Sequence, residues 1–549
     1  MQKYSLIISI IIILLFFSCV KEKPTPSVYD LKIVKTKNIL LNNNDKILSY
    51  SQKQLIKLDN NNIIILNING KKLSFYNINN GQKVHEIITD SKKNLDSYFF
   101  VNKDSIFIFY EESHPPSDED REIPGQFQLI DYYGNIKIKY PYNIAMSDWH
   151  NNVDMKILLP PRQSWEDIHI IQNDIFFKTM TEQIGDVGTK EFMENRLPFM
   201  MRYNTIDQKF YLSKLYNFPY IEEGIYYPTS WSVVNVAISG NNLPLVRYNY
   251  SSNVFEWDYK NDKLITHPLK SRLIDTIMPM TSPSSYHFYN LECAYGQINY
   301  DHYRKLYFAN LYYNSNFYED NDGLRTVIIA NDKFEYLGEL YCNKQFPIYY
   351  TKNNILSIIN SNDSTIKIDY LELIKTNRDF DKYIDSCKND LKIRKEKVEK
   401  IKNAFNNSAN SLIEILKSQQ NIKENNYTVL TIYPTAGCIG CNEFILNFIS
   451  QQKSLLENLP FYLVITADNS KQISKELKKY NLQNFKNLAI DSIGIIKKQT
   501  QHKGLLNPRL TIIRNNKIET DDIYESFETE TTLLATFLNS LGLCFADKE

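Results

Sequence analysis

Short apolar runs separated by turn residues occupy residues 28–374. The clearest unit, residues 62–88, alternates three apolar runs with two turns: Ile63–Leu66, Asn69-Gly70, Leu73–Tyr76, Asn79-Asn80-Gly81 and Val84–Ile88. Asn-Gly supplies the positive φ angles that tight hairpins require. The pattern predicts an antiparallel meander here, and four further runs between Val233 and Leu269 repeat it.

Similar units recur along this whole stretch at about 40–50 residues each, which is the size of a propeller blade. We therefore expect residues 28–374 to form an all-β propeller domain of about six or seven blades. The run from Leu31 to Leu41 is a candidate for the strand that closes the ring. A β-sandwich pair or another all-β array is the alternative fold.

The pattern changes to helical spacing in residues 375–425. Apolar residues recur there at intervals of three, four or seven: Phe380, Ile384, Cys387, Leu391, Val398, Ile401 and Phe405. This predicts an amphipathic helix that ends at Asn406-Asn407-Ser408, with a second helix over Ser411–Lys417. We interpret the segment as a helical connector, and a dimerising coiled coil is the alternative.

Strand and helix patterns alternate in residues 426–549. Predicted strands cover Tyr427–Ile432, Phe461–Thr466 and Arg509–Ile513, and predicted helices follow Cys438, cover Gln472–Tyr480 and close the chain near Thr531–Leu541. This alternation is typical of an α/β domain in which helices cover both faces of a sheet. The expected fold class is thus multidomain, with an all-β domain, a helical connector and an α/β domain.

The candidate chemistry lies between the first strand and first helix of that α/β domain, at Cys438-Ile439-Gly440-Cys441. The free N–H groups and dipole of a helix N-terminus favour a thiolate on Cys438. Cys441 follows one helical turn later, close enough to resolve a mixed disulfide. Two alternatives remain: an inert structural disulfide, and half of a zinc site, although zinc requires four ligands and the sequence has no second CxxC.

The order of elements over about residues 408–544 resembles the thioredoxin fold, and especially the membrane-tethered thiol–disulfide oxidoreductases similar to TlpA and ResA. The resemblance implies that Cys438 is the attacking thiol and Cys441 the resolving thiol. It also implies that Pro508, preceded by Asn507, is a cis-proline where substrate docks, and that the Cys438–Cys441 disulfide is the sole redox group. Three positions depart from the family pattern: Gly437 before the first cysteine, Ile-Gly between the cysteines, and Ile432 where a buried acid is usual.

The N-terminus has the features of a targeting segment. Lys3 precedes an apolar run from Leu6 to Phe17, too short for a comfortable membrane span, and Phe17-Ser18-Cys19 follows. This resembles a bacterial lipoprotein signal peptide over residues 1–18, in which Cys19 is lipidated and residues 19–27 form a tether. Val20 weakly favours the outer membrane, facing the periplasm or the cell surface. An uncleaved anchor or an ordinary secretory signal is the alternative.

Composition and charge argue against some classes of function. Lysine plus arginine and aspartate plus glutamate both number 63, so the sequence shows no basic footprint for nucleic acid. The histidines are scattered without ligand spacing, and no metal site is predicted. The all-β region resembles six-bladed β-propeller lipoproteins of unknown function. We therefore expect a lipid-anchored thiol–disulfide oxidoreductase acting on protein clients, with a propeller of unknown ligand; the alternative is a non-catalytic scaffold whose CxxC is structural.

Overall fold

The computed structural model is a predominantly β multidomain protein. It divides into two compact units, Met1–Asn314 with Asp320–Asn389, and Ser315–Glu319 with Asp390–Glu549. The structure describes residues 24–41, 47, 53–89, 95–110, 126–141, 155–158, 168–178, 180–183, 200–207, 209–212, 234–261, 263–275, 277, 292–314, 317–319, 323–342, 348–362, 364–433, 439–467, 470–492, 494–496, 509–515 and 517–523.

Small antiparallel sheets of four strands build much of the first unit. The first two sheets are β2 (Lys53–Leu58), β3 (Asn61–Ile68), β4 (Lys72–Asn77) and β5 (Lys83–Ile88), and β6 (Leu95–Asn102), β7 (Ser105–Tyr110), β8 (Gln126–Ile130) and β9 (Ile136–Pro141). The next two are β11 (Ile168–Ile171), β12 (Asp174–Lys178), β14 (Met200–Asn204) and β15 (Lys209–Leu212), and β16 (Val234–Ile238), β17 (Pro244–Tyr248), β18 (Asn253–Asp258) and β19 (Lys263–Pro268). A separate pair joins β10 (Met155–Leu158) to β13 (Met180–Gln183).

The predicted meanders are confirmed. The strands expected within residues 62–88 are β3, β4 and β5, and the four expected between Val233 and Leu269 are β16 to β19. Asn69 and Gly70 have φ angles of 54° and 65°, which are the positive values that a two-residue hairpin turn requires. Local turn chemistry and short apolar runs were therefore sufficient to predict these strands.

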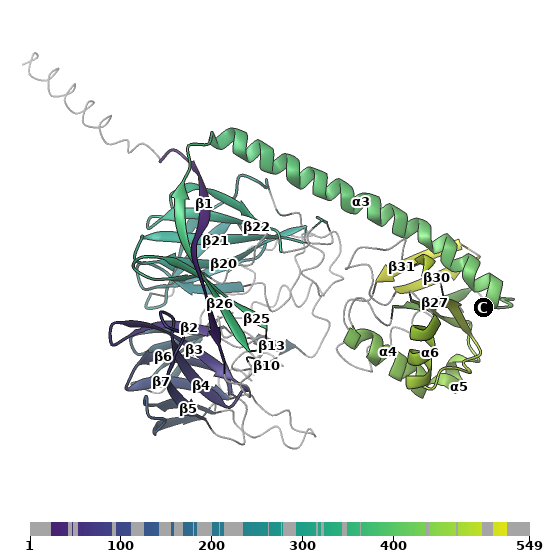
Figure 1. Ribbon diagram of the computed structural model, residues 1–549, viewed down its shortest axis with the longest axis horizontal. Helices are drawn as coiled ribbons and strands as arrows, with labels where there is room; N and C mark the ends of the chain where they lie inside the picture. Colours follow the sequence, from purple (N-terminus) through teal and green to yellow (C-terminus); the bar gives the residue numbers. More distant parts are fainter. Residues whose placement is uncertain are drawn as a thin grey trace, which may run out of the picture. The chain divides into compact units, whose positions relative to one another are not determined.

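The remaining sheet of the first unit joins the two ends of its chain. Its order is β20-β21-β22-β23-β1-β26-β25-β24, with β20 (Cys293–Asp301), β21 (Leu306–Tyr313), β22 (Arg325–Asn331), β23 (Tyr336–Cys342), β1 (Ser27–Leu40), β26 (Thr365–Lys375), β25 (Ile355–Asn362) and β24 (Ile348–Tyr350). β1 pairs with β26 along almost its whole length (Figure 1). It pairs with β23 at Ser27 and Val28. The predicted strand at Leu31–Leu41 is thus present as β1, and it completes the sheet of the last three strands.

Successive sheets of the first unit pack face to face. One apolar cluster joins β3 and β4 to β6 and β7, a second joins β12 and β14 to β17 and β18, and a third joins β21 and β22 to β25 and β26. β6 contacts β11, and β20 contacts β16 and β17. A fourth cluster packs β25 and β26 on β3 and β4, so the series of packed sheets returns to the sheet where it began.

Helix α3 (Phe380–Gln419) follows β26 and is uninterrupted (Figure 1). The predicted break at residues 406–408 is therefore wrong. Asparagine and serine lower helix propensity by only about 0.5 kcal/mol each, and tertiary packing on both sides outweighs that cost. Cys387 and Leu391 are buried in the first half of the helix, and Leu412 and Leu416 are fully buried in the second half.

The second unit contains a five-stranded mixed sheet. Its order is β29-β28-β27-β30-β31, with β29 (Leu488–Asp491), β28 (Phe461–Thr466), β27 (Tyr427–Ile432), β30 (Arg509–Arg514) and β31 (Lys517–Ile523). One face packs on α4 (Ile439–Gln451), α5 (Lys453–Leu456) and α6 (Ser470–Lys479), and the other packs on the end of α3. The predicted covering of both faces is confirmed, and the predicted terminal helix at 531–541 lies outside the described residues.

Membrane-spanning helices were also sought. Across the ranges that the structure describes, no helix combines the length and the apolar character needed to cross a bilayer.

Gly338 tests the contact between β1 and β23. Its φ is 156°, and a Cβ there would lie 1.9 Å from the Ser27 carbonyl oxygen. We expect Gly338→Ala to lower the free energy of unfolding of the first unit by about 2–4 kcal/mol, from backbone strain and the clash together. All four tryptophans lie in residues 149–257, so urea unfolding followed by tryptophan fluorescence measures this unit.

The matched control is Gly81→Ala, because Gly81 also has a positive φ, of 77°, but its added Cβ would meet only an atom 3.9 Å away. It should cost about 1 kcal/mol. Equal losses in the two variants would contradict the role assigned to the β1–β23 contact.

Glu256 gives a pH prediction for the same unit. Burial alone would raise the pKa of this carboxyl, but hydrogen bonds from His267, Ser239 and Asn241 outweigh it and hold the pKa below its usual value. Its contribution to stability is therefore present above the unfolded-state pKa of about 4.3 and lost as pH falls through the lower folded-state pKa. Glu256→Gln should be less stable at neutral pH by about 1–3 kcal/mol. Tryptophan-monitored urea unfolding should show that deficit shrinking below about pH 4, whereas a pH-independent deficit would contradict this.

Candidate functional site

The candidate site lies at one edge of the mixed sheet in the second unit. The parallel strands β27, β28 and β29 all end there, and the antiparallel strand β30 begins there, with Thr431 paired to Arg509. The carboxyl ends of parallel strands are the usual place for functional groups in α/β sheets. All six residues of β27 are buried, so this central strand fixes the position of whatever follows it.

Asn442 holds the two sides of the CxxC segment together. Its Nδ2 donates a hydrogen bond of 2.8 Å to the carbonyl oxygen of Tyr433, the residue that follows β27. Asn442 is 1% exposed and Tyr433 is fully buried. Since a buried hydrogen bond is costly to break, this contact clamps the end of β27 to the first turn of α4.

The first turn of α4 contains Cys441 and no acidic residue. In the sequence Cys438 directly precedes Ile439, where α4 begins. Free backbone N–H groups and the dipole at the N-terminus of a helix stabilise negative charge. Glu443 lies further along the helix and is ion-paired with Lys479 at 2.6 Å.

The other predicted site residues are less fully placed. Cys441 is placed as part of α4, and nothing is described of its side chain; Cys438, Asn507, Pro508 and Cys19 lie outside the described residues. Ile432, at the position where a buried acid is usual in the thioredoxin pattern, is fully buried in the apolar cluster beneath α4. β30 begins at Arg509, directly after Pro508, and Arg509 is fully buried.

Asp491 is a buried acid at this edge that the sequence analysis missed. Its Oδ2 accepts hydrogen bonds from Thr466 Oγ1 at 2.8 Å and from the Ile496 backbone N–H at 2.8 Å, and its Oδ1 accepts one from Ile495 N–H at 3.0 Å. The carboxylate thereby joins the ends of β28 and β29 and caps the following turn. An aspartate directly after the run Leu488-Ala489-Ile490 was the signal available in the sequence.

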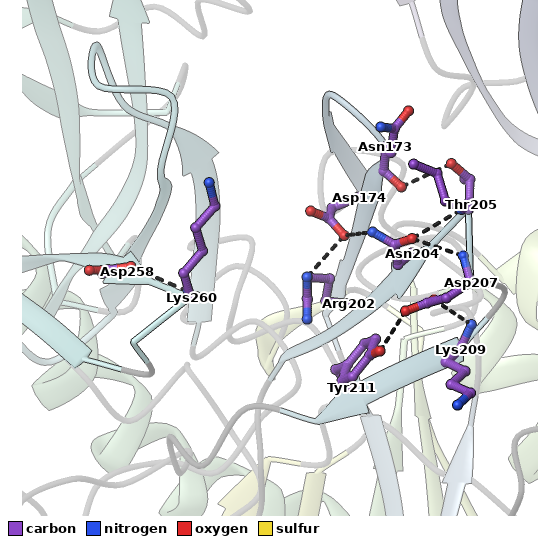
Figure 2. A network of polar contacts seen from close by, with 11 residues as sticks. Asn173, Asp174, Arg202, Asn204, Thr205, Asp207, Lys209, Tyr211, Asp258 and Lys260 are labelled. Atoms are coloured by element: carbon purple, nitrogen blue, oxygen red, sulfur yellow. Dashed lines mark hydrogen bonds and ion pairs between the residues drawn. The ribbon is translucent and has the colours of Figure 1, made fainter.

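A second polar network lies on the sheet of β11, β12, β14 and β15 (Figure 2). Arg202 Nη1 is 3.1 Å from Asp174 Oδ1, and Asn204 Nδ2 donates to the same oxygen at 2.8 Å. The Arg202 guanidinium also stacks 4.3 Å from the Tyr211 ring, whose hydroxyl donates to Asp207 at 2.6 Å. The positive charge of Arg202 is balanced within the network by Asp174, so this arrangement stabilises the sheet. The sequence analysis missed it because its members come from three separate strands.

Metal ligands were sought among the same side chains. Within the ranges described by the structure, no group of three or more histidine, cysteine, aspartate or glutamate residues is arranged to hold a metal ion.

Comparison with known proteins gives a structural similarity but no match by sequence. No family model matches the chain, and no curated protein matches it. A member of the DUF4221 family from Bacteroides vulgatus ATCC 8482 is structurally similar over 64% of this chain and 100% of its own, with 13% sequence identity and a TM-score of 0.47.

These comparisons correct the family resemblances drawn from the sequence. Neither the family models nor the curated proteins return a TlpA- or ResA-type oxidoreductase or a six-bladed propeller lipoprotein. The structural similarity reported above is to a DUF4221 protein instead. The assignment of this chain to those two families is therefore wrong. The order of elements that led to it is a local pattern, which chains of different families share.

The clamp at Asn442 can be tested by Asn442→Leu. Loss of a buried hydrogen bond should destabilise the second unit by about 1–3 kcal/mol. Since every tryptophan lies in the first unit, amide hydrogen exchange of peptides from β27 and α4 is the appropriate measurement, and exchange should be faster in the variant.

Asn458→Leu is the matched control. Asn458 Nδ2 also donates a 2.8 Å hydrogen bond to a backbone carbonyl, that of Ser454, but this bond is exposed. Its loss should change stability by less than about 0.5 kcal/mol. Identical exchange in the two variants would show that the buried clamp does not matter.

Proposed function

We propose that this protein is an exported thiol–disulfide oxidoreductase, tethered to the cell envelope by a lipid on Cys19. Cys438 is its attacking thiol and Cys441 its resolving thiol. The β-sheet unit binds the client protein or positions it. The proposal rests on this chain's own residues and does not depend on membership of a known redox family.

The observation that carries the proposal is the junction of β27 and α4. A fully buried strand leads, through a short segment clamped by Asn442, into a helix that begins one residue after Cys438. A cysteine at this position has its thiolate stabilised by the helix N-terminus. The first helical turn carries no acid that would oppose that charge.

The reaction is an exchange of two electrons between dithiol and disulfide. The Cys438 thiolate attacks one sulfur of a client disulfide, forms a mixed disulfide and releases the other client sulfur as a thiolate. The Cys441 thiolate then attacks Cys438, which releases the reduced client and leaves the Cys438–Cys441 disulfide. Reversal of the same steps donates a disulfide to a client. Asn507 and Pro508, which precede β30, are proposed to dock the client backbone.

The finer architecture proposed for the first unit is a propeller of six blades, in which each of the four four-stranded sheets is one blade and the eight-stranded sheet supplies two. In this arrangement β24, β25, β26 and β1 form the last blade, and β20 to β23 the one before it. The continuous series of packed sheets supports this proposal, as does the pairing of the N-terminal strand with β26. Such a unit presents loops from every blade at one end, where protein ligands commonly bind.

Lipidation of Cys19 and an outer-membrane location are proposed from the sequence alone. The apolar run from Leu6 to Phe17 and the cysteine that follows support export and processing. Membrane fractionation and mass spectrometry of the mature N-terminus test this part separately from the redox chemistry.

Trapping tests the redox proposal. In Cys441→Ser the mixed disulfide on Cys438 cannot be resolved, so client proteins should remain covalently attached and should be released by dithiothreitol. Cys438→Ser should trap nothing and should reduce insulin disulfides only at the uncatalysed rate. Cys387→Ser, which alters a buried cysteine on α3, should trap nothing and keep the activity of the native chain.

The outcome against the proposal is equally definite. A native chain without dithiol activity, in which Cys438 and Cys441 resist alkylation until they are reduced and Cys438 then alkylates no faster than an ordinary thiol, would make the CxxC a structural disulfide. The protein would then act as a non-catalytic binding or scaffold lipoprotein.

A further inference from the structure

Arg247 is a charged residue enclosed between two sheets of the first unit. It lies on β17 and is fully buried. The face of β17 that carries Arg247 is directed to β20 of the next sheet, because its guanidinium lies 4.1 Å from the centre of the Tyr295 ring. The opposite face, which carries Val246 and Tyr248, belongs to the apolar cluster shared with β12 and β14.

The hydrogen bonds of Arg247 are incomplete. Nη2 donates to the carbonyl oxygen of Leu269 at 3.1 Å. Nε and Nη1 are both buried and have no hydrogen-bond partner among the residues that the structure describes. A guanidinium carries five N–H donors. Most of the five on Arg247 therefore have no hydrogen-bond acceptor among the described residues.

Among the described residues, the positive charge of Arg247 also lacks a carboxylate partner. Arg202 and Arg304, which are less buried, are each paired with an aspartate, Asp174 and Asp301. Glu339 is linked to the Tyr295 ring through Ser271, whose hydroxyl donates to Glu339 and whose backbone N–H donates to the Tyr295 hydroxyl. Glu339 already accepts hydrogen bonds from Ser271, Arg272 and Tyr336, and burial raises the pKa of its carboxyl.

A second acid near Arg247, Glu256, is also engaged. Glu256 pairs with Leu245 across β17 and β18, which places it on the same face as Arg247. Its carboxylate is bound by His267 at 2.9 Å and by Asn241 at 3.0 Å. Both carboxylates are thus bound by groups other than Arg247.

Arg247 remains a cation despite its burial. Burial lowers the pKa of its guanidinium to about 10, which still leaves it protonated at neutral pH. Stacking on an aromatic ring offsets only part of the cost of burying a charge. A water molecule satisfies an N–H donor but does not compensate the charge, whereas an anion does both.

We propose that Arg247 anchors a small bound anion of the size of chloride between β17 and β20. The anion accepts hydrogen bonds from Nε or Nη1 and neutralises the guanidinium. The neighbouring residues set the size of the ligand, because Leu269, Ser271 and Tyr295 are each at most 2% exposed. A phosphate ester or a large organic acid would require these packed groups to separate. The site stabilises the contact between two sheets and does not depend on the thiol chemistry proposed above.

Bromide is the probe, because it replaces chloride and scatters anomalously. Crystals of the full-length protein grown or soaked in sodium bromide should show an anomalous peak in contact with Arg247 Nε or Nη1. In solution, thermal unfolding of the native chain should occur a few degrees higher in sodium bromide or chloride than in sodium gluconate of equal ionic strength, since an anion that binds only the folded state raises its stability.

Two variants separate this site from general salt effects. Arg247→Met should remove the difference between halide and gluconate. Arg304→Met, which alters an arginine already paired with Asp301 at 2.6 Å, should retain it. A bromide-soaked native crystal without a peak at Arg247 would overturn the proposal, and this result decides the matter even if Arg247→Met does not fold. An unchanged halide dependence in a folded Arg247→Met would overturn it as well.

Discussion

The pairing of β1 with β26 is the constraint on which the first unit depends. It joins Tyr29 to Lys375 and Leu40 to Thr365. The strands of every other sheet of the unit lie between β1 and β26 in the sequence, so the two ends of this long segment must come together. Closing so long a loop is less costly than intuition suggests, because each doubling of its length adds only about 0.6 kcal/mol. The stabilisation comes from the backbone ladder and the apolar cluster behind it, in which Ile39 packs with Ile366 and Ile368. The surface ion pair of Asp30 with Arg378 at 2.6 Å contributes little, as exposed pairs generally do.

The second unit has a corresponding constraint in β27. This strand is paired on both sides, with β28 and β30, and its two faces belong to two different apolar clusters. Leu430 and Ile432 pack beneath α4 and α6, whereas Val429 and Tyr433 pack against the end of α3. A strand held on four sides has no freedom to shift its register. The segment that follows β27 therefore starts from a rigid position, which is what a reactive pair of cysteines requires.

Buried polar groups give both units their specific geometry. Asn442, Asp491 and Glu339 are each at most 2% exposed, and each joins segments that are distant in the sequence or that diverge from a strand end. Leaving such a group without a partner costs about 1–3 kcal/mol, so alternative registers that would break these bonds are disfavoured. Arg247 does not follow this rule, because part of its guanidinium has no partner among the described residues. This difference distinguishes it from an ordinary core residue.

The sequence by itself determined the local elements. Asn69-Gly70 defined a hairpin, the alternating runs from Val233 to Leu269 defined four strands, and the apolar run Phe461–Thr466 defined β28 to the residue, because turn chemistry and side-chain periodicity act over a few residues. Four features emerged only from the folded chain: α3 continues through Asn406-Asn407-Ser408, β1 returns to β26, Asn442 clamps Tyr433, and Arg247 is enclosed without an acid among the described residues. Each of these depends on contacts between distant segments, whose energies outweigh local propensity and leave no periodic trace in the chain.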